Sequence, residues 1–126
     1  MHRAYKIFYC EIFYISFSLV IWVSKMLAKK IYEQLDLLSR HIRVLEVVRE
    51  KQPIGIARIS HILNIGDYEV RHSLAILEKN GLIEPTSNGA IIKGNINDAL
   101  LTLAEELNEI EDITKLIRKE VLKLVI

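Results

Sequence analysis

Hydrophobic residues recur at helical spacing in the first half of the chain. Between Leu27 and Gln52 there is no glycine or proline, and apolar residues return every three or four positions. This spacing is typical of one face of a helix, which Pro53 would end. A second, short helix is predicted over Ile54 to Leu63, because the apolar positions 56, 59, 62 and 63 share one face. Asn64-Ile65-Gly66 is a predicted turn, since Asn and Gly tolerate the left-handed conformation.

A third helix is predicted from Tyr68 to Asn80. Asp67 is the expected N-cap and Gly81 the residue that stops the helix. Spacings of four and three residues define the buried face, formed by Val70, Leu74 and Leu77. The helix therefore has one face for a core and another for solvent or a partner.

A β-hairpin is predicted after the third helix. Two short apolar runs, 82–85 and 90–93, flank Thr86-Ser87-Asn88-Gly89, and Asn-Gly between such runs is a strong hairpin signal. Two helices joined by a short turn and followed by a hairpin make a winged helix-turn-helix. The expected fold is thus mainly α with a small β-hairpin.

The C-terminal stretch predicts one long helix, because residues 97–126 contain no glycine or proline and Asn97 can cap its start. Its apolar residues repeat at spacings of three and four over nearly four heptads, as in a coiled coil. Thr114 is the one polar member and is expected to help fix the register. The seam, which we interpret as a homodimer interface, comprises Leu100, Leu103, Leu107, Ile110, Thr114, Ile117, Val121 and Leu124.

Two features of this tail leave alternatives open. The seam could instead fold back on the first helix of the same chain, whose apolar spacing matches. In a parallel dimer Glu106 would face Glu111, whereas in an antiparallel one Glu111 could meet Arg118. Exposed pairs of this kind differ by only tenths of a kcal/mol, so these flanks favour the antiparallel arrangement only slightly.

The first 25 residues differ from the rest of the chain. Seven of the nine aromatic residues lie there, and residues 12–23 carry no charge. One interpretation is a start codon assigned too far upstream of Met26, and another is a membrane anchor over residues 4–24; a packed part of the fold is a third. As an anchor, the segment would hold the domain on the cytoplasmic side, because Lys25, Lys29 and Lys30 follow it. We expect a cytoplasmic protein, anchored or not, divided into residues 1–25, 26–94 and 95–126.

Composition narrows the class of protein. The chain of 126 residues is 51% hydrophobic and 26% charged, which predicts an ordered globular domain. The net charge of +1 hides a gradient: residues 1–52 carry +4, residues 53–94 carry zero and residues 95–126 carry −3. The single cysteine, Cys10, excludes a disulfide framework. The histidines lack metal-ligand spacing, and no phosphate loop or nucleophile pair is present, so we expect neither an enzyme nor a cofactor.

The segment RISHILNIGDYEVRHSLAILEKNGLIEP resembles the helix-turn-helix and first wing strand of prokaryotic winged-helix transcription regulators, especially small archaeal ones. The resemblance covers residues 36–94. Two positions depart from the pattern: Asn64 stands where the family usually has Gly, and Ser60 where it usually has Ala. The resemblance implies a transcription regulator that binds double-stranded DNA as a dimer, with no small-molecule ligand evident.

By that resemblance the third helix enters the major groove and its N-terminal half reads bases. Arg71 could bind guanine or a phosphate, and Ser73 is a weaker candidate because it lies closer to the buried face. The candidate DNA-binding residues are Tyr68, Glu69, Arg71, His72, Ala75 and Lys79 on the helix, and Asn88 and Lys93 on the wing.

The zero charge of residues 53–94 argues against this hypothesis, because affinity for DNA comes largely from neutralising phosphates. Arg40, Arg43 and Arg49 of the first helix would improve binding if they joined the surface. The alternative is a winged-helix module that binds proteins and not DNA, tethered to a membrane if the head is an anchor.

Overall fold

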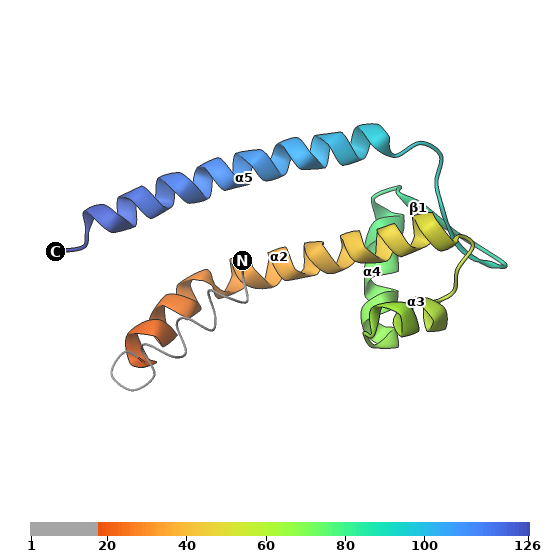
Figure 1. Ribbon diagram of the computed structural model, residues 1–126, viewed down its shortest axis with the longest axis horizontal. Helices are drawn as coiled ribbons and strands as arrows, with labels where there is room; N and C mark the ends of the chain where they lie inside the picture. The colour runs from red at the N-terminus through yellow and green to blue at the C-terminus, as the bar shows by residue number, and fades with distance from the viewer. Residues whose placement is uncertain (1–17) are drawn as a thin grey trace. The chain divides into compact units, whose positions relative to one another are not determined.

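The computed structural model describes residues 18–126, and side chains from Leu27 onward. Its elements are, in order, α2 (Ser18–Lys51), α3 (Ile56–Leu63), α4 (Asp67–Lys79), β1 (Ile83–Thr86), β2 (Gly89–Ile92) and α5 (Asn97–Lys123) (Figure 1). The predicted fold class is confirmed, because this part of the chain is mostly helical, with one small antiparallel hairpin and a long C-terminal helix.

The chain divides into two compact units, residues 1–43 and 44–126. α2 crosses this division, and it begins at Ser18 and not at the predicted Leu27. The extension has a simple cause, since no glycine or proline interrupts the chain between Ser18 and Gln52. The boundary expected between residues 25 and 26 therefore falls inside a helix.

The part of α2 in the first unit presents apolar side chains to solvent. Leu27 is 84% exposed and Ile31 54% exposed, and Lys29 pairs with Glu33 one turn later at 3.8 Å. The expected head lies largely in residues 1–17, outside the described residues, as does most of the predicted membrane span over 4–24. Within residues 18–126, no helix has both the length and the apolar character that crossing a membrane requires.

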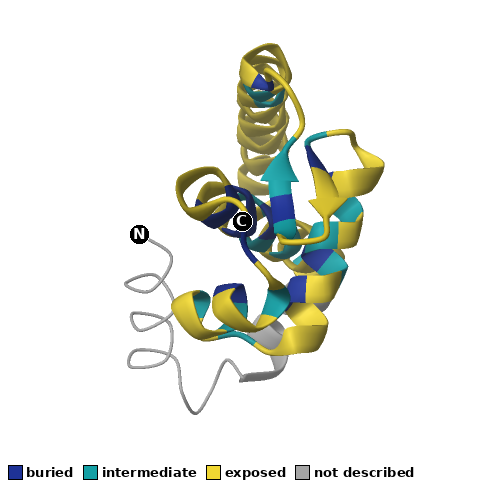
Figure 2. Ribbon diagram, turned by 90° about the vertical axis from the view of Figure 1, so that its right-hand side faces the viewer, coloured by how far each residue is buried: buried dark blue, intermediate teal, exposed yellow. Residues whose placement is uncertain are grey.

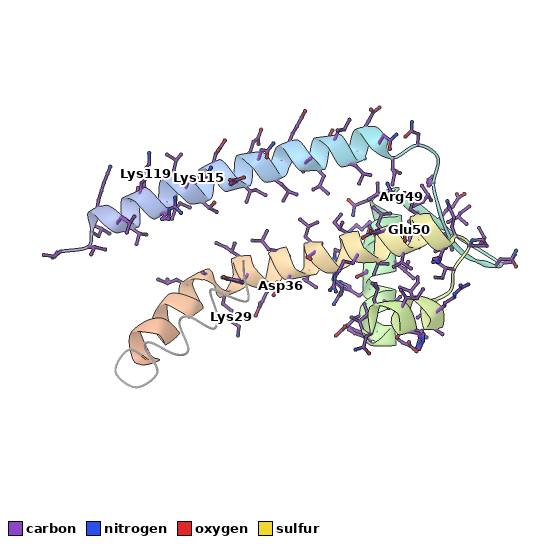
Figure 3. The ribbon with its side chains drawn as sticks, in the orientation of Figure 1. Lys29, Asp36, Arg49, Glu50, Lys115 and Lys119 are labelled. Carbon is purple, nitrogen blue, oxygen red and sulfur yellow. The ribbon has the colours of Figure 1, made fainter. Side chains whose placement is uncertain are left out.

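The core lies in the second unit, where the end of α2 meets α3, α4 and the hairpin. Figure 2 shows buried positions gathered on the facing sides of these elements. α2 contributes four residues from its last two turns. The buried apolar residues are Val44, Leu45, Val47, Val48, Ile54, Ile59, Val70, Leu77, Ile83, Ala90 and Ile96.

The turn between α3 and α4 has the predicted backbone. Asn64 adopts the left-handed conformation, with φ of 54°, and its N–H donates to the carbonyl of Ser60. The Ser60 hydroxyl donates to the carbonyl of Ile65, so this side chain closes the turn as well as leaving room for the helix crossing. The expected N-cap at Asp67 is wrong: Gly66 occupies that position and Asp67 is the first helical residue. There its carboxylate still suits the positive end of the helix.

The hairpin is present, but its turn differs in detail from the prediction. β1 and β2 pair antiparallel, with Thr86 opposite Gly89, so the two loop residues are Ser87 and Asn88. Gly89 follows them at φ of 127°. The Thr86 hydroxyl donates to the Gly89 carbonyl at 2.6 Å and accepts the Asn88 N–H at 3.2 Å. The loop is thus closed by a threonine side chain as well as by the strand ladder.

The prediction that the second helix starts at Ile54 is wrong. Ile54 pairs with Ala90 as an isolated β-bridge, donating its N–H to the Ala90 carbonyl at 3.2 Å and accepting the Ala90 N–H at 2.8 Å. Nearby, the side-chain oxygen of Gln52 accepts the N–H of Ile92 at 2.8 Å. The connection between α2 and α3 therefore fastens the hairpin to the core.

α5 is attached to this core at its start only. Ile96 is 7% exposed, and Leu100 packs against the buried cluster. The expected N-cap at Asn97 is wrong, because Asn97 is already helical; its N–H is instead bound by the side-chain oxygen of Asn95 at 3.0 Å. No residue of α5 is fully buried, so the rest of the helix makes little contact within the second unit.

Candidate nucleic-acid interface

The exposed face of α4 carries most of the candidate DNA-binding residues. Its opposite face is closed by Val70, Ser73 and Leu77, all buried in the core. Residues at helical spacing on the other side point away from that core. They are Tyr68, which is 82% exposed, Arg71, Ala75 and Lys79, all exposed, and His72, which is half-buried.

Two predicted residues of α4 are less accessible than the rest. Ser73 is fully buried, which agrees with its expected place beside the buried face. His72 is partly covered and already interacts within the chain. The accessible polar groups on this face are therefore the Tyr68 hydroxyl, the Arg71 guanidinium and the Lys79 ammonium.

Acidic residues flank this face. Asp67 and Glu69 lie in the first turn of α4, where carboxylates favour the helix dipole. Glu78 is exposed in the last turn, next to Lys79. Glu69, a candidate by the family resemblance, would repel a phosphate if it faced one, so its role in this helix is better explained by the dipole.

The two wing candidates are both exposed. Asn88 lies in the two-residue loop between the strands, and Lys93 follows β2. The Lys93 N–H donates to the carbonyl of Leu82 at 3.0 Å, which leaves the side chain as the part that can reach a ligand. The hairpin thus offers one amide and one ammonium group at its surface.

Further positive charge within the second unit comes from two exposed arginines. Arg49 lies in the last turn of α2, and Arg58 lies on α3. Arg40 and Arg43, grouped with Arg49 by the sequence argument, belong to the first unit. Arg58 was not singled out from the sequence. Its charge, and its position next to the apolar Ile59, were the signals that could have placed it on the exposed face of α3.

The predicted seam on α5 is open along most of its length. Leu100 and Leu103 are half-buried, whereas exposure rises from 38% at Leu107 to 80% at Leu124. The Thr114 hydroxyl donates to the Glu111 carbonyl in its own helix at 2.7 Å, and Glu111 pairs with Lys115 at 3.1 Å. Other apolar residues of α5 widen this face. They are Leu101, Ile113, Leu116 and Leu122, each more than half exposed.

No group of histidine, cysteine, aspartate or glutamate side chains among the described residues is placed to hold a metal ion. The chemistry available on these surfaces is hydrogen bonding, charge pairing and apolar contact.

Comparison with solved structures gives a structural likeness. No protein-family model matches the chain, and no curated protein matches it. Among solved structures, it is similar to the activation domain of the phage T4 transcription factor MotA, with 27% sequence identity and a TM-score of 0.41. The match covers 59% of this chain and 78% of that domain.

Proposed function

We propose that this chain is a DNA-binding transcription regulator of the prokaryotic winged-helix kind, acting as a dimer without catalysis or a cofactor. In this proposal α3 and α4 form the helix-turn-helix, α4 enters the major groove, and the β1–β2 hairpin is the wing. The observation that carries the proposal is the exposed face of α4, opposite the buried Val70 and Leu77 and with Tyr68, Arg71 and Lys79 accessible.

Each accessible group of α4 has a distinct task. Arg71 lies in the N-terminal half, which reads bases in helix-turn-helix proteins, and its fork suits the two acceptors of guanine. The Tyr68 hydroxyl and the Lys79 ammonium, one near each end of α4, are suited to phosphates. Ala75 lies between them and leaves the backbone room to approach the base edges.

The lack of net positive charge in the helix-turn-helix and hairpin bears on affinity. Residues 53–94 have no net charge, so one copy would bind DNA weakly. A dimer doubles the number of phosphate contacts and presents two reading helices to a pseudo-palindromic site. The exposed seam of α5 supports the proposed dimer, because an apolar face of this length is normally covered by a partner.

The test is a titration of the full chain with duplex DNA selected from a random-sequence pool, at low and high salt. We expect binding at low salt that weakens as salt rises. Arg71→Ala should cost about 1–3 kcal/mol on the selected sequence and little on unrelated duplexes. Lys115→Ala is the matched control, since it removes one exposed positive charge outside α4.

Two results would contradict the proposal in different ways. No binding at low salt would remove DNA as the partner and favour the alternative, a winged-helix module that assembles proteins. A loss from Arg71→Ala that is equal on all sequences would make Arg71 a phosphate contact, and base reading would then have to come from other residues.

A further inference from the structure

The charges of α5 fall into two blocks of opposite sign. Residues 97–112 carry six acidic side chains and no basic one, whereas residues 113–126 carry four basic side chains and one acidic. The helix dipole favours such charges only in the first and last turns, where Asp98 and Lys123 lie. The five remaining acidic residues, at positions 105–112, lie about two to four turns into the helix, so the dipole does not explain them.

The exposed seam runs through both blocks. Leu107 and Ile110 lie in the acidic block, and Ile117 and Val121 lie in the basic block, all between 38% and 55% exposed. An apolar face whose two halves carry opposite charge is complementary to a copy of itself turned end for end. No other occupant matches both halves as simply.

We propose that a second copy of this chain covers the seam, with the two α5 helices antiparallel and Glu111 of each copy next to Arg118 of the other. This orientation rests on the dimer of the proposed function. The two-fold axis then passes between Thr114 and Ile117, and Leu107 lies opposite Leu124 of the second copy. The acidic block of each helix runs beside the basic block of the other.

Other pairings of the same seam are less favourable. In a parallel pair Glu106 of each helix faces Glu111 of the other, and the two acidic blocks lie side by side. An antiparallel pair shifted by one heptad brings Glu111 against Glu111 of the second copy. Only the proposed arrangement places Glu111 of each copy beside Arg118 of the other.

The orientation also sets where the two DNA-facing units lie. α5 starts at the core, through Ile96 and Leu100, so antiparallel helices carry the two cores at opposite ends of the pair. In the proposed register the two copies of Leu100 lie about 46 Å apart along the pair, at 1.5 Å per residue. That separation is larger than the roughly 34 Å between successive major-groove faces on one side of DNA.

The first experiment reverses one charge and measures the dimer dissociation constant of the full chain by sedimentation equilibrium. Glu111→Arg places like charges together twice in the antiparallel dimer, so the constant should rise about tenfold. In a parallel dimer the same change would create attraction to Glu106 and tighten the dimer. Asp112→Arg is the control, because it changes the same charge at a neighbouring position that faces away from the seam.

Two further variants make the test decisive. Adding Arg118→Glu to Glu111→Arg swaps the pair and should restore the parent constant, which a general loss of helix stability would not do. In chains with Cys10→Ser, Leu107→Cys and Leu124→Cys should form a mixed disulfide on oxidation. Either variant alone should stay unlinked, because the two copies of Leu124 lie about 25 Å apart.

The outcomes separate this proposal from the proposed function. A disulfide between two copies of the same cysteine variant, or a tighter dimer with Glu111→Arg, would overturn the antiparallel orientation and leave the dimer intact. A chain that stays monomeric at all concentrations would overturn both the orientation and the dimer, in favour of α5 folding onto its own chain. DNA binding is judged separately, by the titration with Arg71→Ala.

Discussion

Gly89 is held by two constraints at once. Its φ of 127° disfavours any side chain, and a Cβ there would lie 2.5–2.7 Å from the backbone of Ile54. The three nearest atoms all belong to the backbone of Ile54, so they cannot move aside easily.

We therefore expect Gly89→Ala to lower the free energy of unfolding by more than about 2 kcal/mol. Chemical denaturation of the full chain measures this. Gly55→Ala is the control, because its φ is negative and the added methyl group meets no atom; as a helix N-cap it should cost about 1 kcal/mol or less. Equal losses for the two variants would show that the Ile54 contact does not constrain Gly89.

The sequence predicted single residues well where the cause is local. Asn64 in the left-handed conformation and Ser73 beside the buried face follow from backbone preference and helical spacing. The predicted helix N-caps were wrong, because neighbouring residues compete for the N-cap position and the sequence does not rank Gly66 above Asp67. The need for glycine at position 89 depends on Ile54, a residue too distant in the chain for local pattern to reveal.

At the scale of the element, α5 combines helical propensity with an uncovered apolar face. Ile110→Glu places a charge in the middle of the seam, and we expect it to raise the dimer dissociation constant at least tenfold while the chain stays folded. Sedimentation measures the assembly, and circular dichroism confirms the fold. Asn108→Glu adds the same charge off the seam and should leave the dimer intact; if Ile110→Glu also sediments like the parent, the seam is not the interface.

All five elements expected from Leu27 onward are found, counting the hairpin as one. Hydrophobic periodicity and the positions of glycine and proline sufficed to predict these elements, because glycine and proline are confined to residues 53–94 and mark each connection. The error at Ile54 arose because one apolar residue next to Pro53 fits a helix start and a β-bridge equally well. Pairing with Ala90 decides between them, and only the folded chain supplies that partner.

At the scale of the whole molecule, a dimer doubles the effect of each contact with DNA. Lys79→Ala should therefore lower the slope of log affinity against log salt by about 2, one unit for each copy of the chain. The titration must be made above the dimer dissociation constant. Lys115→Ala should leave the slope unchanged, and a decrease of only about 1 for Lys79→Ala would show that a single copy contacts the DNA.

The candidate site could be predicted only as a list of residues on one helix face. Spacing alone places Tyr68, Arg71, Ala75 and Lys79 together, and the exposure of each in the structure agrees with that placement. What spacing does not supply is accessibility, as His72 shows, because this side chain is half-buried and already interacts within the chain. The partner that fills the seam of α5 lies outside one chain altogether.

The bridge between Ile54 and Ala90 has a consequence for the order of folding. It joins residues 36 positions apart, so closing it costs chain entropy that the local contacts of α3 and α4 do not. We expect these helices to form before the hairpin docks, and the hairpin to detach first when the protein opens. Amide hydrogens of β1 and β2 would then exchange faster than those of α4, and the wing would be the least protected part of the core.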